Sequence, residues 1–207
     1  MEGHTEGVAE EIMYAHIHFD RVPDPEKSEL NPEVISIDAL TDQTPLHKLR
    51  GISDSVPEFM GITWSTTPEK IADLGFAVKK ITAWTEKATA TAITYPGIKQ
   101  LSLVSRKDSL NREEFYRLYR NHEKIAKNHH GMQRYAQNID LELVYGSHDS
   151  SSDIDAISEL WFASEVDWSQ RFYIHSNSAT IIREDTERFI DFHNTSSILV
   201  SEIQIRR

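Results

Sequence analysis

Apolar and polar residues alternate along much of the chain, which is the pattern of strands with one buried face. Alternation predicts strands over residues 12–20 and 132–145, and strands are also expected over residues 59–65, 88–95, 98–106, 156–163 and 194–205. Apolar residues at helical spacing follow Asn111 and Glu114, a capping-box pair, and predict a long helix that ends at Gly131. Further helices are expected over residues 46–52, 66–75, 76–87, 164–173 and 181–189.

The two halves of the chain follow the same order of elements. In each half, a β-prone segment precedes a strand with a tryptophan near its end, then a capped helix and a returning strand. This order predicts an α+β fold of two fused ferredoxin-like β-α-β-β-α-β units, residues 1–97 and 98–207, the first degenerate in its middle. The two sheets would close an intramolecular, pseudo-dimeric α+β barrel around a cavity. We therefore expect a monomer or a homodimer of such barrels.

Residues 98–205 resemble the EthD family of dimeric α+β-barrel proteins. The segment SRKDSLNREEFYRLYRNHEKIAKNHHGMQRYAQN carries the first part of the motif, at Arg106, Phe115, Tyr119, His122, Gly131 and Tyr135. The blocks AISELWF and EDTERFID carry the second part, at Glu159, Trp161, Phe162, Asp185, Phe189 and Asp191. Arg120 departs from the pattern, because the family usually has tryptophan there. The first half shares the order of elements but not the motif.

The resemblance implies a protein without cofactors that holds an aromatic or polyketide-like molecule in a barrel cavity. Its relatives look like cyclases, dehydratases, decarboxylases and cofactor-free oxygenases, or like accessory proteins without clear chemistry. We therefore expect a lyase or cyclase of secondary-metabolite biosynthesis that acts on a ketone through histidine acid–base chemistry. A non-catalytic small-molecule carrier, a cofactor-free oxygenase and a metal-dependent lyase are the alternatives.

Composition narrows the classes of partner. The net charge of −11 repels phosphate, so we expect no nucleic-acid partner. No apolar run is long enough for a membrane span, and the acidic N-terminal residues lack the pattern of a signal peptide, so we expect a cytoplasmic protein. Without cysteine there is no disulfide, thiolate nucleophile or cysteine-ligated metal. The glycine-rich phosphate-binding motifs are also absent from the sequence.

Ten histidines make proton-transfer chemistry the first candidate. His122 lies on the apolar face of its helix and matches the family histidine, so it is the leading general acid or base. His16 and His18 share one face of their strand with Tyr14, and would meet a ligand if that face lines the barrel. A metal site there is less favoured, because the spacing supplies no further ligands. Structural packing is the alternative for each of them.

A second set of residues is expected to bind the substrate. Aromatic side chains can form a wall for a flat ligand, and an arginine after the first strand of the second half can hold a carboxylate or enolate. The predicted substrate-binding residues are Trp64, Tyr119, Tyr135, Trp161, Phe162 and Arg106. Aromatic residues in strands also belong to ordinary cores, so a structural role is the alternative.

Overall fold

The computed structural model describes residues 10–26, 31–51, 56–85, 97–147 and 153–205. The strands are β1 (Glu10–His18), β2 (Val34–Leu40), β3 (Gly61–Ser65), β4 (Leu74–Thr85), β5 (Ile98–Val104), β6 (Arg134–Tyr145), β7 (Ala156–Phe162) and β8 (Ser196–Gln204). The helices are α1 (Thr44–Arg50), α2 (Arg112–His129), α4 (Glu165–Arg171) and α5 (Ser178–Thr186). The strand expected over residues 88–95 lies outside the described residues.

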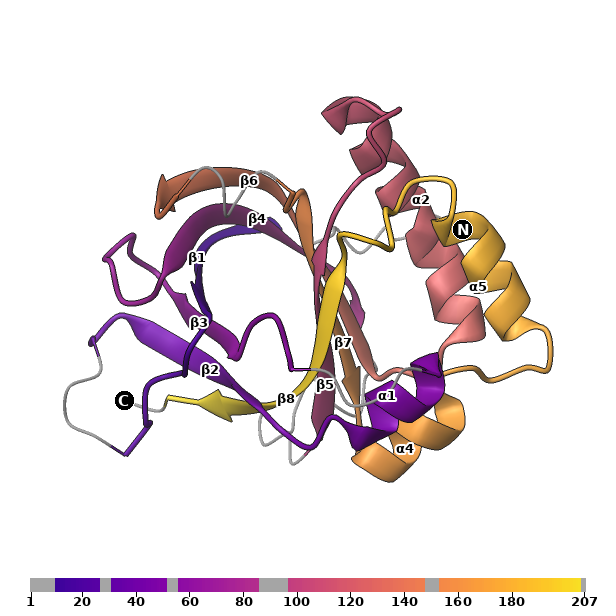
Figure 1. Cartoon of the computed structure of the whole chain (residues 1–207), viewed down its shortest axis with the longest axis horizontal. Coiled ribbons are helices and arrows are strands. Elements are labelled where there is room, and N and C mark those ends of the chain that lie inside the picture. The colour runs from indigo at the N-terminus through magenta and orange to yellow at the C-terminus, as the bar shows by residue number, and fades with distance from the viewer. Residues whose placement is uncertain (1–9, 27–30, 52–55, 86–96, 148–152, 206–207) are drawn as a thin grey trace, which may run out of the picture.

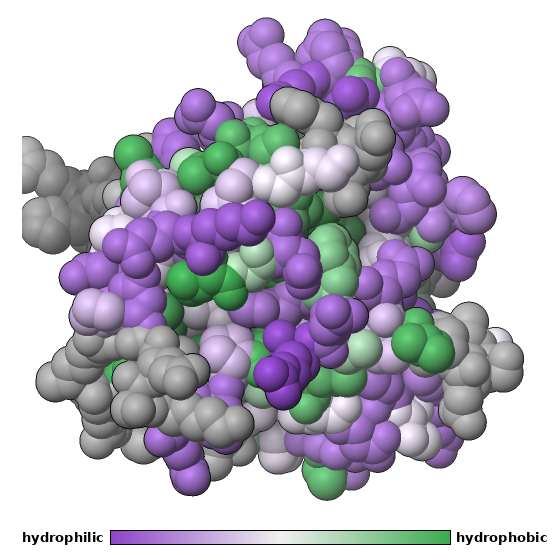
Figure 2. All heavy atoms as spheres, turned by 60° about the vertical axis from the view of Figure 1, so that its left-hand side comes forward, coloured by the Kyte–Doolittle hydropathy of each residue, from purple (hydrophilic) through white to green (hydrophobic). Residues whose placement is uncertain are grey.

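The eight strands form one closed antiparallel barrel in the order β1-β3-β2-β8-β5-β7-β6-β4 (Figure 1). In each half of the chain, the first strand lies between the fourth and the third. All four helices lie on the side of the barrel where β5, β7 and β8 run (Figure 1). The opposite side has no helix over it among the described residues, and hydrophilic side chains predominate on that face (Figure 2).

The predicted fold of two ferredoxin-like units in an α+β barrel is therefore wrong: the molecule is a closed β-barrel made mostly of strands. The helices expected over residues 66–75 and 76–87 do not form in the part that the structure describes, residues 66–85. Residues 66–73 are a loop, and Leu74–Thr85 is the strand β4. Leu74, Phe76 and Val78 alternate along β4 and are buried, so barrel packing stabilises a strand here. The division of the chain after residue 97 stays a prediction.

The barrel interior can be identified from its apolar cluster. Ala15, Trp64 and Phe76 from the first half belong to the same buried cluster as Leu101 and Ile157 from the second half. Residues on opposite walls of a closed barrel can share a cluster only inside it. Two further clusters lie between the outer face of the second-half strands and the helices.

Helix α2 begins as the sequence predicts. The Asn111 side chain accepts a hydrogen bond from the Glu114 amide, and the Glu114 carboxylate accepts one from the Asn111 amide. The buried residues of the helix include Phe115, Tyr119 and His122, at spacings of four and three. This face packs on the strands and also contacts α5.

We predict that Gly61→Ala lowers the free energy of unfolding by about 1–3 kcal/mol. Gly61 has φ +149°, and an added Cβ would lie 1.9 Å from the Asp38 carbonyl oxygen on β2. Chemical denaturation measures the effect. Gly51→Ala is the control, because Gly51 has φ +65° with nothing within 4 Å of its Cβ position, so only backbone strain is added. A smaller loss for Gly61→Ala than for Gly51→Ala would contradict the packing at β2 and β3.

Candidate functional site in the barrel interior

The pair His16 and His18 lies on the outer face of β1, not inside the barrel. Ala15 and Ile17, which alternate with them, belong to the interior cluster. His16 is held by two contacts, from Nδ1 to the Tyr145 hydroxyl at 2.6 Å and from Nε2 to the Ser65 hydroxyl at 2.6 Å. The face of β1 that carries these histidines therefore does not line the barrel, so they would not meet a ligand held inside it.

Hydrogen bonds on this outer face of β1 connect it to neighbouring elements. His18 Nε2 lies 2.8 Å from the Thr63 hydroxyl on β3, and Tyr14 is half-buried on the same face. The Ser65 hydroxyl donates to the Thr67 carbonyl at 2.6 Å, so the proton on His16 lies on Nε2 and Tyr145 donates to Nδ1. The network ties the loop after β3 and the end of β6 to β1.

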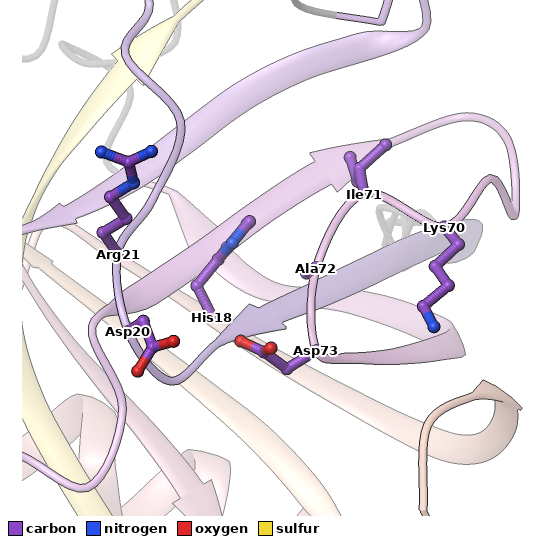
Figure 3. A pocket seen from close by; sticks show the side chains of 7 residues that line it. All are labelled: His18, Asp20, Arg21, Lys70, Ile71, Ala72 and Asp73. Carbon is purple, nitrogen blue, oxygen red and sulfur yellow. The ribbon is translucent and has the colours of Figure 1, made fainter.

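An open pocket of about 460 Å³ lies beside His18 and is lined by His18, Asp20, Arg21, Lys70, Ile71, Ala72 and Asp73. In Figure 3, Arg21 and Lys70 lie on opposite sides of His18, and the Asp20 and Asp73 carboxylates lie below it. The charged side chains of the pocket are exposed, and the two cations are balanced by two carboxylates. Among the described residues, no group of three His, Asp or Glu is placed to hold a metal ion.

The histidine environment predicts acid sensitivity. Burial lowers the pKa of His16 to about 4, with a contribution from His18, and burial also lowers the pKa values of His18 and His130 to about 4. Because each folded pKa lies below the unfolded value of about 6.5, the neutral forms stabilise the fold above pH 6.5. That stability is lost as the pH falls from 6.5 towards 4, by at most about 1.4 kcal/mol per pH unit for each histidine.

Urea denaturation between pH 7.5 and 4.5 measures this loss. His18→Gln should unfold with a shallower pH dependence than the natural chain, because one titrating group is removed. An unchanged slope in this variant would show that the pKa of His18 is the same in the folded and unfolded protein, which contradicts the lowering by burial.

His122 lies outside the barrel, between α2 and α5. Its Nδ1 is 2.8 Å from the Asp185 carboxylate, both side chains are nearly buried, and the ring packs on Phe189. The hydrogen bond from His122 lowers the pKa of Asp185, and Arg188 also pairs with this carboxylate at 3.1 Å. The contact joins the two helices, so it gives His122 a packing role whether or not it also transfers protons.

The predicted substrate-binding residues fall into three places. Trp64 is in the interior cluster, and Trp161 shares its face of β7 with Glu159. Tyr119, Tyr135 and Phe162 belong to the clusters beneath the helices. Arg106 follows the far end of β5 and pairs with Asp155 at 3.1 Å. The structure therefore brings only the two tryptophans together inside the barrel.

Five charged side chains meet in the interior beside these tryptophans. Sequence reasoning predicted none of them as a site residue, and it named only Glu159, as part of the family motif. The ammonium of Lys99 lies 2.7 Å from Asp38, 2.8 Å from Glu159 and 2.8 Å from Glu202. The ammonium of Lys80 lies 2.7 Å from the other Glu159 oxygen. Asp38 and Glu159 are fully buried and Lys99 is 1% exposed, while Lys80 is the most exposed of the five at 12%. We name these five residues the interior cluster of charges.

Each carboxylate of this cluster also accepts a hydrogen bond from a neutral side chain. The hydrogen bonds run from Trp64 Nε1 to Asp38 at 2.7 Å, from Trp161 Nε1 to Glu202 at 2.8 Å and from Asn138 Nδ2 to Glu159 at 2.9 Å. Charge-assisted hydrogen bonds of this kind fix the position of a carboxylate. The cluster is therefore an ordered site.

Three cations lie over the faces of the two indole rings. Lys80 Nζ lies 4.6 Å from the ring centroid of Trp64 and 5.6 Å from that of Trp161. Lys99 Nζ lies 4.6 Å from Trp161, and the guanidinium carbon of Arg134 lies 4.5 Å from the same ring. Cation–π attraction is strongest for tryptophan and grows when water is excluded. Positive charge and aromatic surface therefore occupy the same part of the barrel.

The environment shifts the pKa values of the cluster in different directions. Burial raises the pKa of Asp38 to about 7, with support from Glu202 and Glu159 and against the attraction of Lys99. Lys80 and Lys99 lower the pKa of Glu159 despite its burial, and Lys99 lowers that of Glu202. The three carboxylates raise the pKa of Lys99 against the effect of its burial. Asp38 is thus the member that changes protonation near neutral pH.

A closed antiparallel β-barrel with ionisable groups at its centre is the class that this fold and site define. Residues 107–193 match the family model of the EthD domain. This part of the chain is similar to the EthD domain, which confirms the family resemblance. The comparison with curated proteins gave no match. None of the helices in the described ranges is long and apolar enough to span a membrane.

Proposed function

We propose that this protein is a cofactor-independent acid–base enzyme whose reacting groups are Asp38, Lys99 and Lys80 in the barrel interior. The observation that supports this most is the interior cluster of charges. Burying charges costs several kcal/mol each, and apolar residues of similar volume often replace buried ion pairs without loss of stability. Ionisable groups with opposed pKa shifts at one buried place are typical of active sites.

The substrate class follows from the aromatic rings and from the family resemblance. An aromatic or polyketide-type ketone would lie against Trp64 and Trp161, with its carbonyl oxygen directed to an ammonium group. Asp38 in its ionised form would take a proton from the carbon next to the carbonyl, and the carbon–hydrogen electron pair would form the enolate. Lys99 and Lys80 would stabilise the negative oxygen. The Asp38 proton would then return to carbon, or protonate a leaving hydroxyl in a dehydration.

Asp38 is preferred to His122 as the proton-transfer group because of its surroundings. Asp38 contacts the Lys99 ammonium and the Trp64 indole N–H, whereas His122 packs between two helices against Phe189. An enolate needs positive charge close to its oxygen, and the lysines of the interior cluster of charges supply it. The sequence-based proposal that His122, His16, His18 and Tyr14 transfer protons stays a prediction and provides the competing hypothesis.

The first experiment measures proton exchange. Acetophenone is incubated with the protein in D₂O, and deuterium in its methyl group is followed by mass spectrometry, with and without a chelator. We expect exchange above the rate without protein and no effect of the chelator. Binding without exchange would favour the carrier, and a gain of oxygen the cofactor-free oxygenase. A rate equal to the background, with no binding, would contradict the proposed use of a ketone.

A further inference from the structure

A third cation joins the aromatic part of the interior. Trp161 on β7 is paired in register with Lys99 on β5 and with Arg134 on β6. The guanidinium of Arg134 and the ammonium of Lys99 lie 4.5 Å and 4.6 Å from the indole centroid. A ligand that stacks on this ring would therefore be within reach of both cations.

Arg134 differs from the other two cations in its partners. Lys99 contacts three carboxylates and Lys80 contacts one, but no carboxylate pairs with Arg134 among the described residues. Its Nε is buried and has no hydrogen-bond partner there. A buried N–H of a charged group without an acceptor costs more than a neutral one, so Arg134 is short of an acceptor that a ligand can supply.

The charge balance of the region favours an anion while Asp38 is protonated, and it is even when Asp38 is ionised. Lys80, Lys99 and Arg134 supply three positive charges, and the carboxylates of Glu159 and Glu202 supply two negative ones. Asp38 adds a third only in its ionised form. Glu11, which stands across from Lys80 on β1, is exposed and therefore screened by water.

We propose that Arg134 binds a carboxylate of the substrate, so that the substrate is an aromatic keto acid and not a neutral ketone. This inference rests on the proposed function, because it assigns the substrate class of the same site. A guanidinium offers two parallel N–H groups to a carboxylate, which fixes the orientation of the acid as well as its position. The aromatic ring of the substrate would then lie on Trp161, between Arg134 and the proton-transfer groups.

Calorimetric titration with two probes tests the subsite without requiring turnover. The probes are 4-acetylbenzoate, which carries a carboxylate, and acetophenone, which lacks it. We expect 4-acetylbenzoate to bind at least about tenfold more tightly, which corresponds to about 1.4 kcal/mol. Arg134→Gln should abolish this preference, and Arg134→Lys should reduce it, because lysine keeps the charge without the planar fork.

Arg120→Gln is the matched control. Arg120 on α2 also has a buried guanidinium nitrogen without a partner among the described residues, so its loss should leave the preference for the acid intact. Equal affinity for the two probes, no binding of the acid, or an unchanged preference in Arg134→Gln would overturn the subsite. If acetophenone exchanges deuterium but the acid has no advantage, the subsite fails and the proposed function stands. If the acid binds through Arg134 and neither probe exchanges deuterium, the subsite stands and the proposed function fails.

Discussion

Replacing Lys99 with methionine is expected to lower the free energy of unfolding by about 3–5 kcal/mol. Methionine fills much of the same space, so packing changes little. The loss comes from charge: Asp38, Glu159 and Glu202 each lie within 2.8 Å of the Lys99 ammonium and would be left buried with one cation fewer. Since domains are stable by about 5–15 kcal/mol, a loss of this size removes a large part of the total stability.

Urea denaturation at pH 7 and 25 °C gives the measurement. Lys70→Met is the control, because Lys70 is an exposed lysine on the outer pocket, and its change should stay within about 0.5 kcal/mol. If Lys99→Met were as stable as the control, the three carboxylates could not be charged and buried around Lys99, and the proposed electrostatics of the interior would be wrong.

Replacing Asp38 with asparagine should reduce the exchange of acetophenone by about 10²–10⁴-fold. Asparagine has the same shape and can still accept from the Trp64 indole at its side-chain oxygen, but it cannot take a proton from carbon. It also removes a group that is partly charged near pH 7. The folded state should therefore persist, which circular dichroism would verify before the rate is interpreted.

His122→Gln is the comparison for this second experiment. Glutamine can still donate a hydrogen bond towards Asp185, so the contact between α2 and α5 has a substitute. We expect this variant to exchange the probe at a rate close to that of the natural chain. Loss of exchange in His122→Gln together with full activity in Asp38→Asn would move the reacting group from the barrel interior to the space between the helices.

The strands of the second half could be predicted because their signal is local. The sequence predicted strands at β5, β6, β7 and β8, with alternation as the signal for β6, and the capping box predicted α2. Residues 74–85 fall within the helices that were expected over residues 66–75 and 76–87. Their true state depends on a partner far away in the sequence: β4 pairs with both β1 and β6, which closes the barrel. Closure of this kind overrides local propensity and has no pattern of its own in the sequence.

The candidate site was predictable only in part. Trp64 and Trp161 were chosen as aromatic side chains, and the structure places both in the interior. The charged site was missed, although Glu159 was named as a motif residue, because Lys99, Glu159 and Asp38 come from three separate strands and their contacts exist only in the closed barrel. A weak signal was present, since Lys99 and Glu159 interrupt strands whose every residue is buried. The sequence did not show whether His16 and His18 face the barrel interior, because both faces of β1 are buried in its second half.

The pH dependence of deuterium exchange tests the central claim most directly. Ionised Asp38 is the base, and its pKa is raised to about 7. The rate should therefore rise with pH through a midpoint near 7 and level off above it. His122→Gln should keep this profile, and Asp38→Asn should lose the rising limb together with the rate. A rising limb that persists in Asp38→Asn, or that disappears only in His122→Gln, would show that Asp38 is not the group that transfers the proton.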